Sequence, residues 1–150
     1  MDKQPLVCDT TVLLYLDRIG QLCLLQALFE PVCVPEPVRL ELAMGRLLRP
    51  DTIDPSQLNW ITPVSVDQSE LDALPPNRLG RGERAVIAYA RSRAGYWVGS
   101  DDRQARLLAE RPTGSRPSGR LHESSSSRIR WHKGLGFCSL LDGRWQSWRK

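Results

Sequence analysis

The chain has 150 residues, of which 41% are hydrophobic and 25% are charged, and its net charge is +4. This length suits one domain with its own core, and the composition is typical of globular rather than disordered or fibrous proteins. No apolar run is long enough for a membrane span, and the one after Pro5 is too short for a secretory signal. We therefore expect a cytoplasmic protein.

The charge is divided unevenly along the chain. Residues 1–110 contain 12 Lys and Arg against 15 Asp and Glu, whereas residues 111–150 contain 9 against 2. The last part also holds four consecutive serines and three of the five tryptophans, with little regular periodicity. We predict a domain over 1–110 and a basic extension over 111–150. The extension either binds RNA through arginines and indoles or has no selected role.

The first half of the chain alternates short apolar runs with helical patterns. In the last predicted helix of this half, Val38 and Leu42 mark the buried side, together with Leu47 or Leu48. The expected elements are a strand over 6–8, a helix over 11–17, a helix over 22–29, a strand over 32–34 and a helix with Pro37 in its first turn that ends near Gly45.

The second half continues the alternation. Pro63 favours an edge position for the first strand of this half, because proline cannot donate to a neighbouring strand. The expected elements are a strand over 60–66, a brief helix over 69–74, a helix over 79–95, a strand over 96–100 and a helix over 101–110. Together they predict an α/β fold with a mainly parallel sheet and helices on both faces.

The four cysteines form no CxxC pair. Two of them, Cys8 and Cys33, lie in apolar runs, so we predict that the cysteines are reduced core residues. His122 and His132 lie in a tract without other metal ligands, so no zinc cluster is expected.

Two acidic residues directly follow predicted strands. Asp9 comes after the first strand and Asp101 after the strand over 96–100. Ligand sites in open parallel sheets lie outside the carboxyl ends of the strands, so these carboxylates could face one another there. Each could equally be the N-cap of the next helix, since Asp is a preferred capping residue.

Two glutamates are candidates for the same site. Glu41 lies at the boundary of the buried face of its helix, where a solvated side chain is the simpler interpretation. Glu83 follows Gly80 and Gly82, which permit close approach, although the dipole of a helix start also favours an acid there. If all four acids converge, they form an oxygen-only pocket that suits Mg²⁺ or Mn²⁺ and hydrolyses phosphodiesters with an activated water.

A family resemblance rests on four segments in this order: VCDTTVLLYLDRIGQLCLLQALF, VCVPEPVRLEL, GRGERAVIAYA and VGSDDRQARLLA. Over residues 4–110 the chain resembles the PIN-domain family, most closely its small bacterial branch of predicted nucleases related to toxin ribonucleases. The resemblance implies a three-layer sandwich, RNA cleavage with Mg²⁺ or Mn²⁺, a small antitoxin partner and a homodimer. The family's functional residues fall on Asp9, Glu41, Glu83 and Asp101, with Asp102 as a neighbouring metal ligand and Thr10 as a supporting hydroxyl.

Two further inferences accompany the resemblance. Arg81, Arg84 and Arg103 are either phosphate contacts or solvated surface residues. After residue 110, the family continues with a valine-rich fifth strand and two helices, whereas this chain continues with RPTGSRPSGRLHESSSS. This departure indicates a shifted reading frame or a degenerate copy.

The leading hypothesis is a metal-dependent ribonuclease, and the alternative is an inactive remnant that binds RNA or an antitoxin.

Overall fold

The structure is a computed structural model that describes residues 3–102 and Leu108. At its centre is a sheet of four parallel strands in the order β3-β2-β1-β4. This arrangement confirms the predicted α/β fold, and β3 lies at an edge, as Pro63 indicated. The strands are β1 (Gln4–Cys8), β2 (Phe29–Pro35), β3 (Ile61–Val64) and β4 (Trp97–Gly99).

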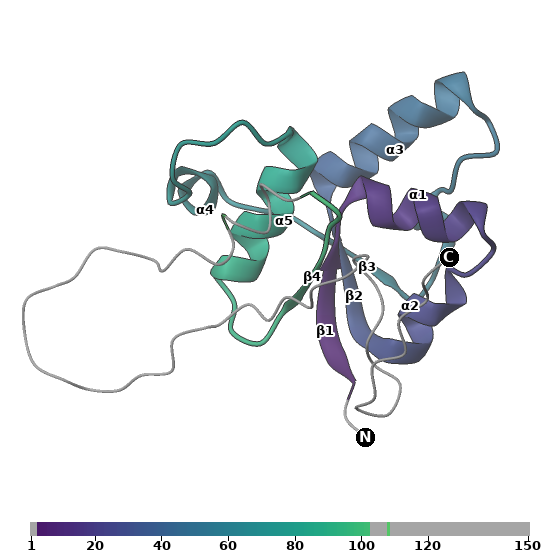
Figure 1. Cartoon of the computed structure of the whole chain (residues 1–150), viewed down its shortest axis with the longest axis horizontal. Coiled ribbons are helices and arrows are strands. Elements are labelled where there is room, and N and C mark those ends of the chain that lie inside the picture. Colours follow the sequence, from purple (N-terminus) through teal and green to yellow (C-terminus); the bar gives the residue numbers. More distant parts are fainter. Residues whose placement is uncertain (1–2, 103–107, 109–150) are drawn as a thin grey trace, which may run out of the picture.

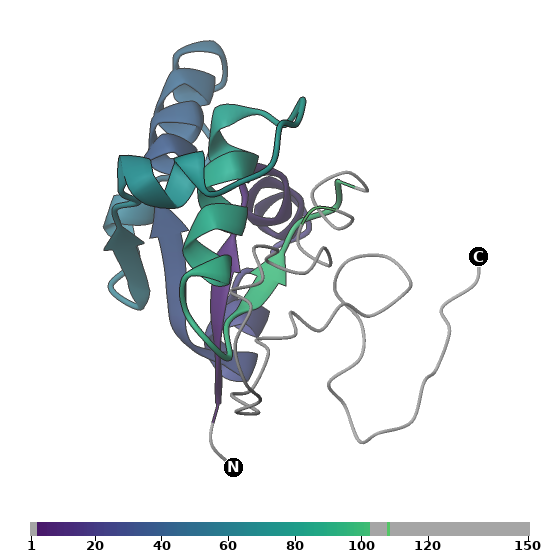
Figure 2. The same ribbon diagram turned by 90° about the vertical axis from the view of Figure 1, so that its left-hand side faces the viewer.

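Helices cover both sides of the sheet. In Figure 1, α1 and α2 lie on one side and α4 and α5 on the other, and Figure 2 gives the same arrangement from a second direction. The helix α3 begins where β2 ends and contacts both α1 and α5. The helices are α1 (Thr10–Arg18), α2 (Cys23–Leu28), α3 (Glu36–Leu48), α4 (Gln68–Asp72) and α5 (Arg81–Arg91), with a short 3₁₀ turn, η1 (Pro55–Gln57).

The central strands are buried, as continuous apolar runs in a parallel sheet require. Leu6, Val7 and Cys8 of β1 and Val32 to Val34 of β2 are each at most 2% exposed. The helix α5 is buried from Ala85 to Ala90. This central packing holds the carboxyl ends of the strands in place.

The strand order creates a switch point beside β1. The chain proceeds from β1 to β2 and β3 in one direction, and then returns to place β4 on the opposite side of β1. The segments that leave β1 and β4 therefore diverge at the carboxyl edge of the sheet. Open α/β sheets bind ligands at such a point.

The second predicted helix is one residue too long at its end. Phe29 has extended backbone and begins β2, so the helix ends at Leu28. Pro31 therefore lies within a strand and does not stop a helix. The strand predicted over 32–34 is correct in position but begins earlier, because Phe29 pairs with Gln4 of β1.

The prediction for α3 is wrong at its end. Gly45 does not stop the helix, which continues to Leu48. The stop comes from Pro50, because a residue before proline is disfavoured in helical conformation, and Arg49 is extended. Leu47 or Leu48 was expected to lie on the buried side, but the two residues are 75% and 87% exposed. This last turn finds no apolar surface to pack against in the described part of the chain.

The remaining differences are smaller. The helix predicted over 79–95 is observed as α5 and ends at Arg91, and Gly95 has a positive φ of 85°. Cys8 and Cys33 are buried as predicted, but Cys23 is exposed.

Among the described helices, none combines the length and apolar content that a bilayer span needs. Most of the predicted helix over 101–110, Cys138, both histidines and the extension over 111–150 lie outside the described residues.

Candidate functional site

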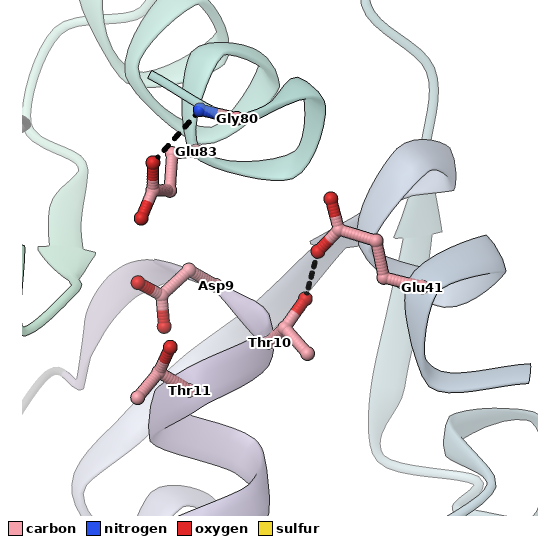
Figure 3. Close-up of a pocket in the computed structure, with 6 residues that line it drawn as sticks. All are labelled: Asp9, Thr10, Thr11, Glu41, Gly80 and Glu83. Carbon is pink, nitrogen blue, oxygen red and sulfur yellow. Dashed lines mark hydrogen bonds between the residues drawn. The ribbon is translucent and has the colours of Figure 1, made fainter. Parts of the chain in front are cut away.

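A hollow of about 170 Å³ lies at the carboxyl edge of the sheet. Figure 3 shows the side chains around it, which come from α1, α3 and the start of α5. The lining residues are Asp9, Thr10, Thr11, Glu41, Gly80 and Glu83. The fold therefore brings three of the four predicted acids to one pocket.

Asp9 is the buried member of this group. It is the N-cap of α1, and its Oδ1 accepts a hydrogen bond of 2.9 Å from the amide of Val12. The residue is only 1% exposed, and its Oδ2 has no hydrogen-bond partner among the described residues. One oxygen caps the helix, as the capping interpretation predicts, and the other is buried without a hydrogen-bond partner among the described residues. The role of Asp9 as a metal ligand stays a prediction.

Burial raises the pKa of Asp9 from 3.8 to about 6, since a desolvated carboxylate is disfavoured in its charged form. The nearby Ser100 hydroxyl and the Val12 amide favour the charged form and offset part of this rise. The charges of Asp101 and Glu83 raise the pKa further. A buried carboxylate among other acids is the environment that a bound cation would relieve.

Glu41 reaches the pocket from α3. Its Oε1 accepts a hydrogen bond of 2.9 Å from the amide of Gly82, and its Oε2 accepts one from the Thr10 hydroxyl. The side chain is not simply solvated, as the alternative interpretation held, because α1 and α5 each donate a hydrogen bond to it. Each oxygen still has a lone pair for a further ligand.

Glu83 lies in the first turn of α5. Its Oε2 accepts a hydrogen bond of 3.0 Å from the amide of Gly80, in a capping arrangement that agrees with the helix-start interpretation. In Figure 3 its carboxylate also points toward Asp9. Capping α5 and facing Asp9 are therefore compatible for this residue.

Asp101 and Asp102 follow β4 and do not line the pocket. Asp101 is exposed, and its negative charge raises the pKa of Asp9. The amide of Asp102 donates a hydrogen bond of 3.2 Å to the Ser100 hydroxyl. Ser100 itself is buried, at 2% exposure. Sequence reasoning missed Ser100, although a serine between a buried strand and two acids could have indicated it.

Two of the predicted phosphate contacts, Arg81 and Arg84, are not among the residues that line the pocket. Arg81 is exposed, and Arg84 is half-buried, with an Nε that has no hydrogen-bond partner in the described part of the chain. Arg103 lies outside the described residues. A role for these arginines therefore stays a prediction.

The fit of the site to a divalent cation depends mainly on Asp9. Within residues 3–102 and Leu108, no three His, Cys, Asp or Glu side chains already form a set that could hold a metal. The unpartnered buried oxygen of Asp9 and the oxygen-only donors around it nevertheless suit a hard cation. A bound cation would therefore require adjustment of the exposed carboxylates around Asp9.

The structure is thus a parallel α/β domain with three acids in a pocket at its switch point. Residues 5–114 match the PIN-domain family, and the chain belongs to that family. PIN domains are in general nucleases and typically use divalent metals. No curated protein and no solved structure matches the chain.

Proposed function

We propose that this protein is a ribonuclease that requires Mg²⁺ or Mn²⁺ and hydrolyses phosphodiester bonds in RNA. The observation that supports this most directly is Asp9, a buried carboxylate with an unpartnered oxygen, surrounded by other acids at the sheet's switch point. Asp9, Glu41, Glu83 and Asp101 would hold the cation, with Asp102 as an additional ligand. When bound, the cation supplies Lewis acidity, which makes water a nucleophile near neutral pH and offsets the charge of the phosphate.

The chain's own residues have two tasks in this proposal. Asp9 lines the pocket, and the hydrogen bond of its cap on α1 restrains the carboxylate. Glu41 and Glu83 are held by amides at the start of α5, which limits their rotation. The second task is electrostatic: the acids oppose binding of RNA until a cation neutralises them.

The test is cleavage of a mixed-sequence RNA by the purified protein in Mn²⁺, in Mg²⁺ and in EDTA. We expect cleavage only with a divalent cation. We also expect a loss of at least about a hundredfold in Asp9→Asn, because loss of a residue that merely orients a metal ligand already costs about 10-fold to 100-fold. A matched control is Asp17→Asn, on the same helix but outside the pocket. Cleavage that persists in EDTA, or in Asp9→Asn, would refute the proposal.

The second candidate is an inactive PIN domain that binds RNA or an antitoxin. The absence of a ready three-ligand set in the described residues favours it, together with the hydrogen bonds that already occupy Glu41 and Glu83. It predicts RNA binding without cleavage and no rise in melting temperature with Mn²⁺. The same cleavage and melting experiments therefore distinguish the two candidates.

A protein partner and a cytoplasmic location complete the proposal. The toxin of a toxin–antitoxin pair would bind a small antitoxin, and a homodimer is also expected from the resemblance. Large apolar side chains on and next to α1 and α3 are exposed, which supports a protein contact there: Tyr15, Ile19, Leu40, Met44, Leu47 and Leu48. Light scattering after size exclusion would give the molar mass that tests the homodimer.

A further inference from the structure

Glu41 is held by donors from two other helices. The Gly82 amide of α5 donates to one carboxylate oxygen at 2.9 Å, and the Thr10 hydroxyl of α1 donates to the other. The Gly82 amide is available because the first amides of a helix have no partner within the helix. An otherwise exposed side chain of α3 is thereby fixed at the edge of the pocket.

Gly82 leaves the space that this contact needs. A Cβ atom at Gly82 would lie 2.7 Å and 2.8 Å from the two Glu41 carboxylate oxygens and 2.9 Å from its Cδ. Such distances are shorter than real Cβ contacts, so the carboxylate would have to move away. Gly82 lies within α5 and has no positive φ, so its conformation does not require glycine. Space for Glu41 is therefore the reason that the structure gives for a glycine here.

We infer that Gly82 is a positioning residue for Glu41, and this inference rests on the proposed metal-dependent function. The bare backbone of Gly82 admits the carboxylate, and its amide holds one oxygen, which leaves lone pairs directed toward the pocket. Hydrogen bonds of this kind orient metal ligands, and their loss typically lowers metal affinity about 10-fold to 100-fold.

The experiment compares Mn²⁺ binding by the full chain and by Gly82→Ala, with calorimetry and melting temperature as readouts. We expect an affinity lower by about 10-fold to 100-fold in Gly82→Ala, while its melting temperature without metal is equal or higher, because alanine is the better helix former. The matched control is Gly45→Ala on α3, where the nearest atom to a new Cβ is 4.0 Å away. Wild-type Mn²⁺ affinity in Gly82→Ala would overturn the inference.

A double-mutant cycle separates positioning from a general structural effect. In the Glu41→Gln background, Gly82→Ala should cause no further loss of Mn²⁺ affinity, because the carboxylate that it displaces is already absent. An equal additional loss in that background would show that Gly82 acts independently of Glu41 and would overturn the inference.

A second readout needs no metal. In amide NMR spectra, Glu41→Gln should move the Gly82 amide proton, which loses a charged acceptor, and leave the Gly45 amide unchanged. If the wild type binds no Mn²⁺, the proposed function fails. The NMR spectrum then tests by itself whether Gly82 positions Glu41. An unmoved Gly82 resonance would then refute the positioning.

Discussion

At the scale of single residues, Asp9 caps α1 and is also the residue on which the proposed metal site depends. A strand-to-helix joint needs a capping side chain, and Oδ1 fulfils that need for Val12. The buried Oδ2 accepts no hydrogen bond from the described residues, although the Ser100 hydroxyl is near enough to lower the pKa of the carboxyl group. A neutral Asn would provide the same cap without the charge, so retention of a carboxylate at this position has a cost in stability.

This cost gives a pH-dependent prediction for Asp9→Asn. The folded-state pKa is about 6 and the ordinary value 3.8, so between these pH values the folded protein keeps a proton that the unfolded chain has released. The free energy of unfolding therefore falls as pH rises through this window, by about 3 kcal/mol for a shift of this size. In EDTA, Asp9→Asn should melt higher than wild type at pH 7.5 and equally at about pH 4.

The measurement is thermal unfolding across this pH range, with Asp17→Asn as the surface control. Mn²⁺ at pH 7.5 should raise the melting temperature of the wild type but not that of Asp9→Asn, because a ligand stabilises only the state that binds it. A variant that melts below wild type at pH 7.5 in EDTA would contradict the predicted cost.

At the scale of elements, one glutamate links α4 to the residues that follow α5. Glu70 of α4 accepts hydrogen bonds from Ser92 and from Arg93, the latter at 2.7 Å, just after α5 ends. The Arg93 guanidinium also lies 3.8 Å from the centre of the Tyr89 ring. Burial raises the pKa of Glu70, but the hydrogen bonds from Ser92, Asp67 and Arg93 together lower it by more. The pKa of Glu70 is therefore below its usual value.

We predict that Arg93→Ala lowers the free energy of unfolding by about 1 to 2 kcal/mol, from the lost ion pair and cation–π contact. The control is Arg39→Ala, whose partner Glu36 lies on the same helix at i−3 and is half exposed. Such a pair contributes only about 0.2 to 0.5 kcal/mol. Urea unfolding at pH 7 measures both variants, and equal losses would show that the attachment of α4 is unimportant.

At the scale of the whole molecule, Leu108 is the last described residue to join the core. It is 4% exposed, and its carbonyl oxygen accepts a hydrogen bond of 3.0 Å from Arg91 of α5. The match to the PIN-domain family ends at residue 114, close to the predicted domain boundary at 110. That boundary stays a prediction, since residues 111–150 lie outside the described part.

Truncation tests the boundary. A chain that ends at residue 114 should keep the melting temperature of the full chain, because it retains the described core. A chain that ends at 102 should lose about 2 to 3 kcal/mol of unfolding free energy through the loss of the buried Leu108 alone. If the chain ending at 114 fails to fold, the basic extension belongs to the domain, and the predicted division is wrong.

The sequence by itself determined the parallel α/β fold and the positions of its strands. Apolar runs such as Leu6 to Cys8 are typical of strands buried on both faces of a parallel sheet. Asp9 and Asp101 follow such strands, so they lie at the carboxyl edge of the sheet. The extent of α3 was predicted poorly, because exposure of Leu47 and Leu48 depends on which surfaces lie opposite them.

Only the tertiary structure decided which groups meet at the site. Glu41 and Gly82 are 41 residues apart in the sequence. No local sequence pattern indicates that the Glu41 carboxylate occupies the space beside the Gly82 backbone. The unpartnered Asp9 oxygen, the buried Ser100 and the displacement of Asp101 from the pocket lining are of the same kind. Sequence periodicity fixes which face of an element is buried, whereas contacts between elements depend on packing distances that sequence patterns do not encode.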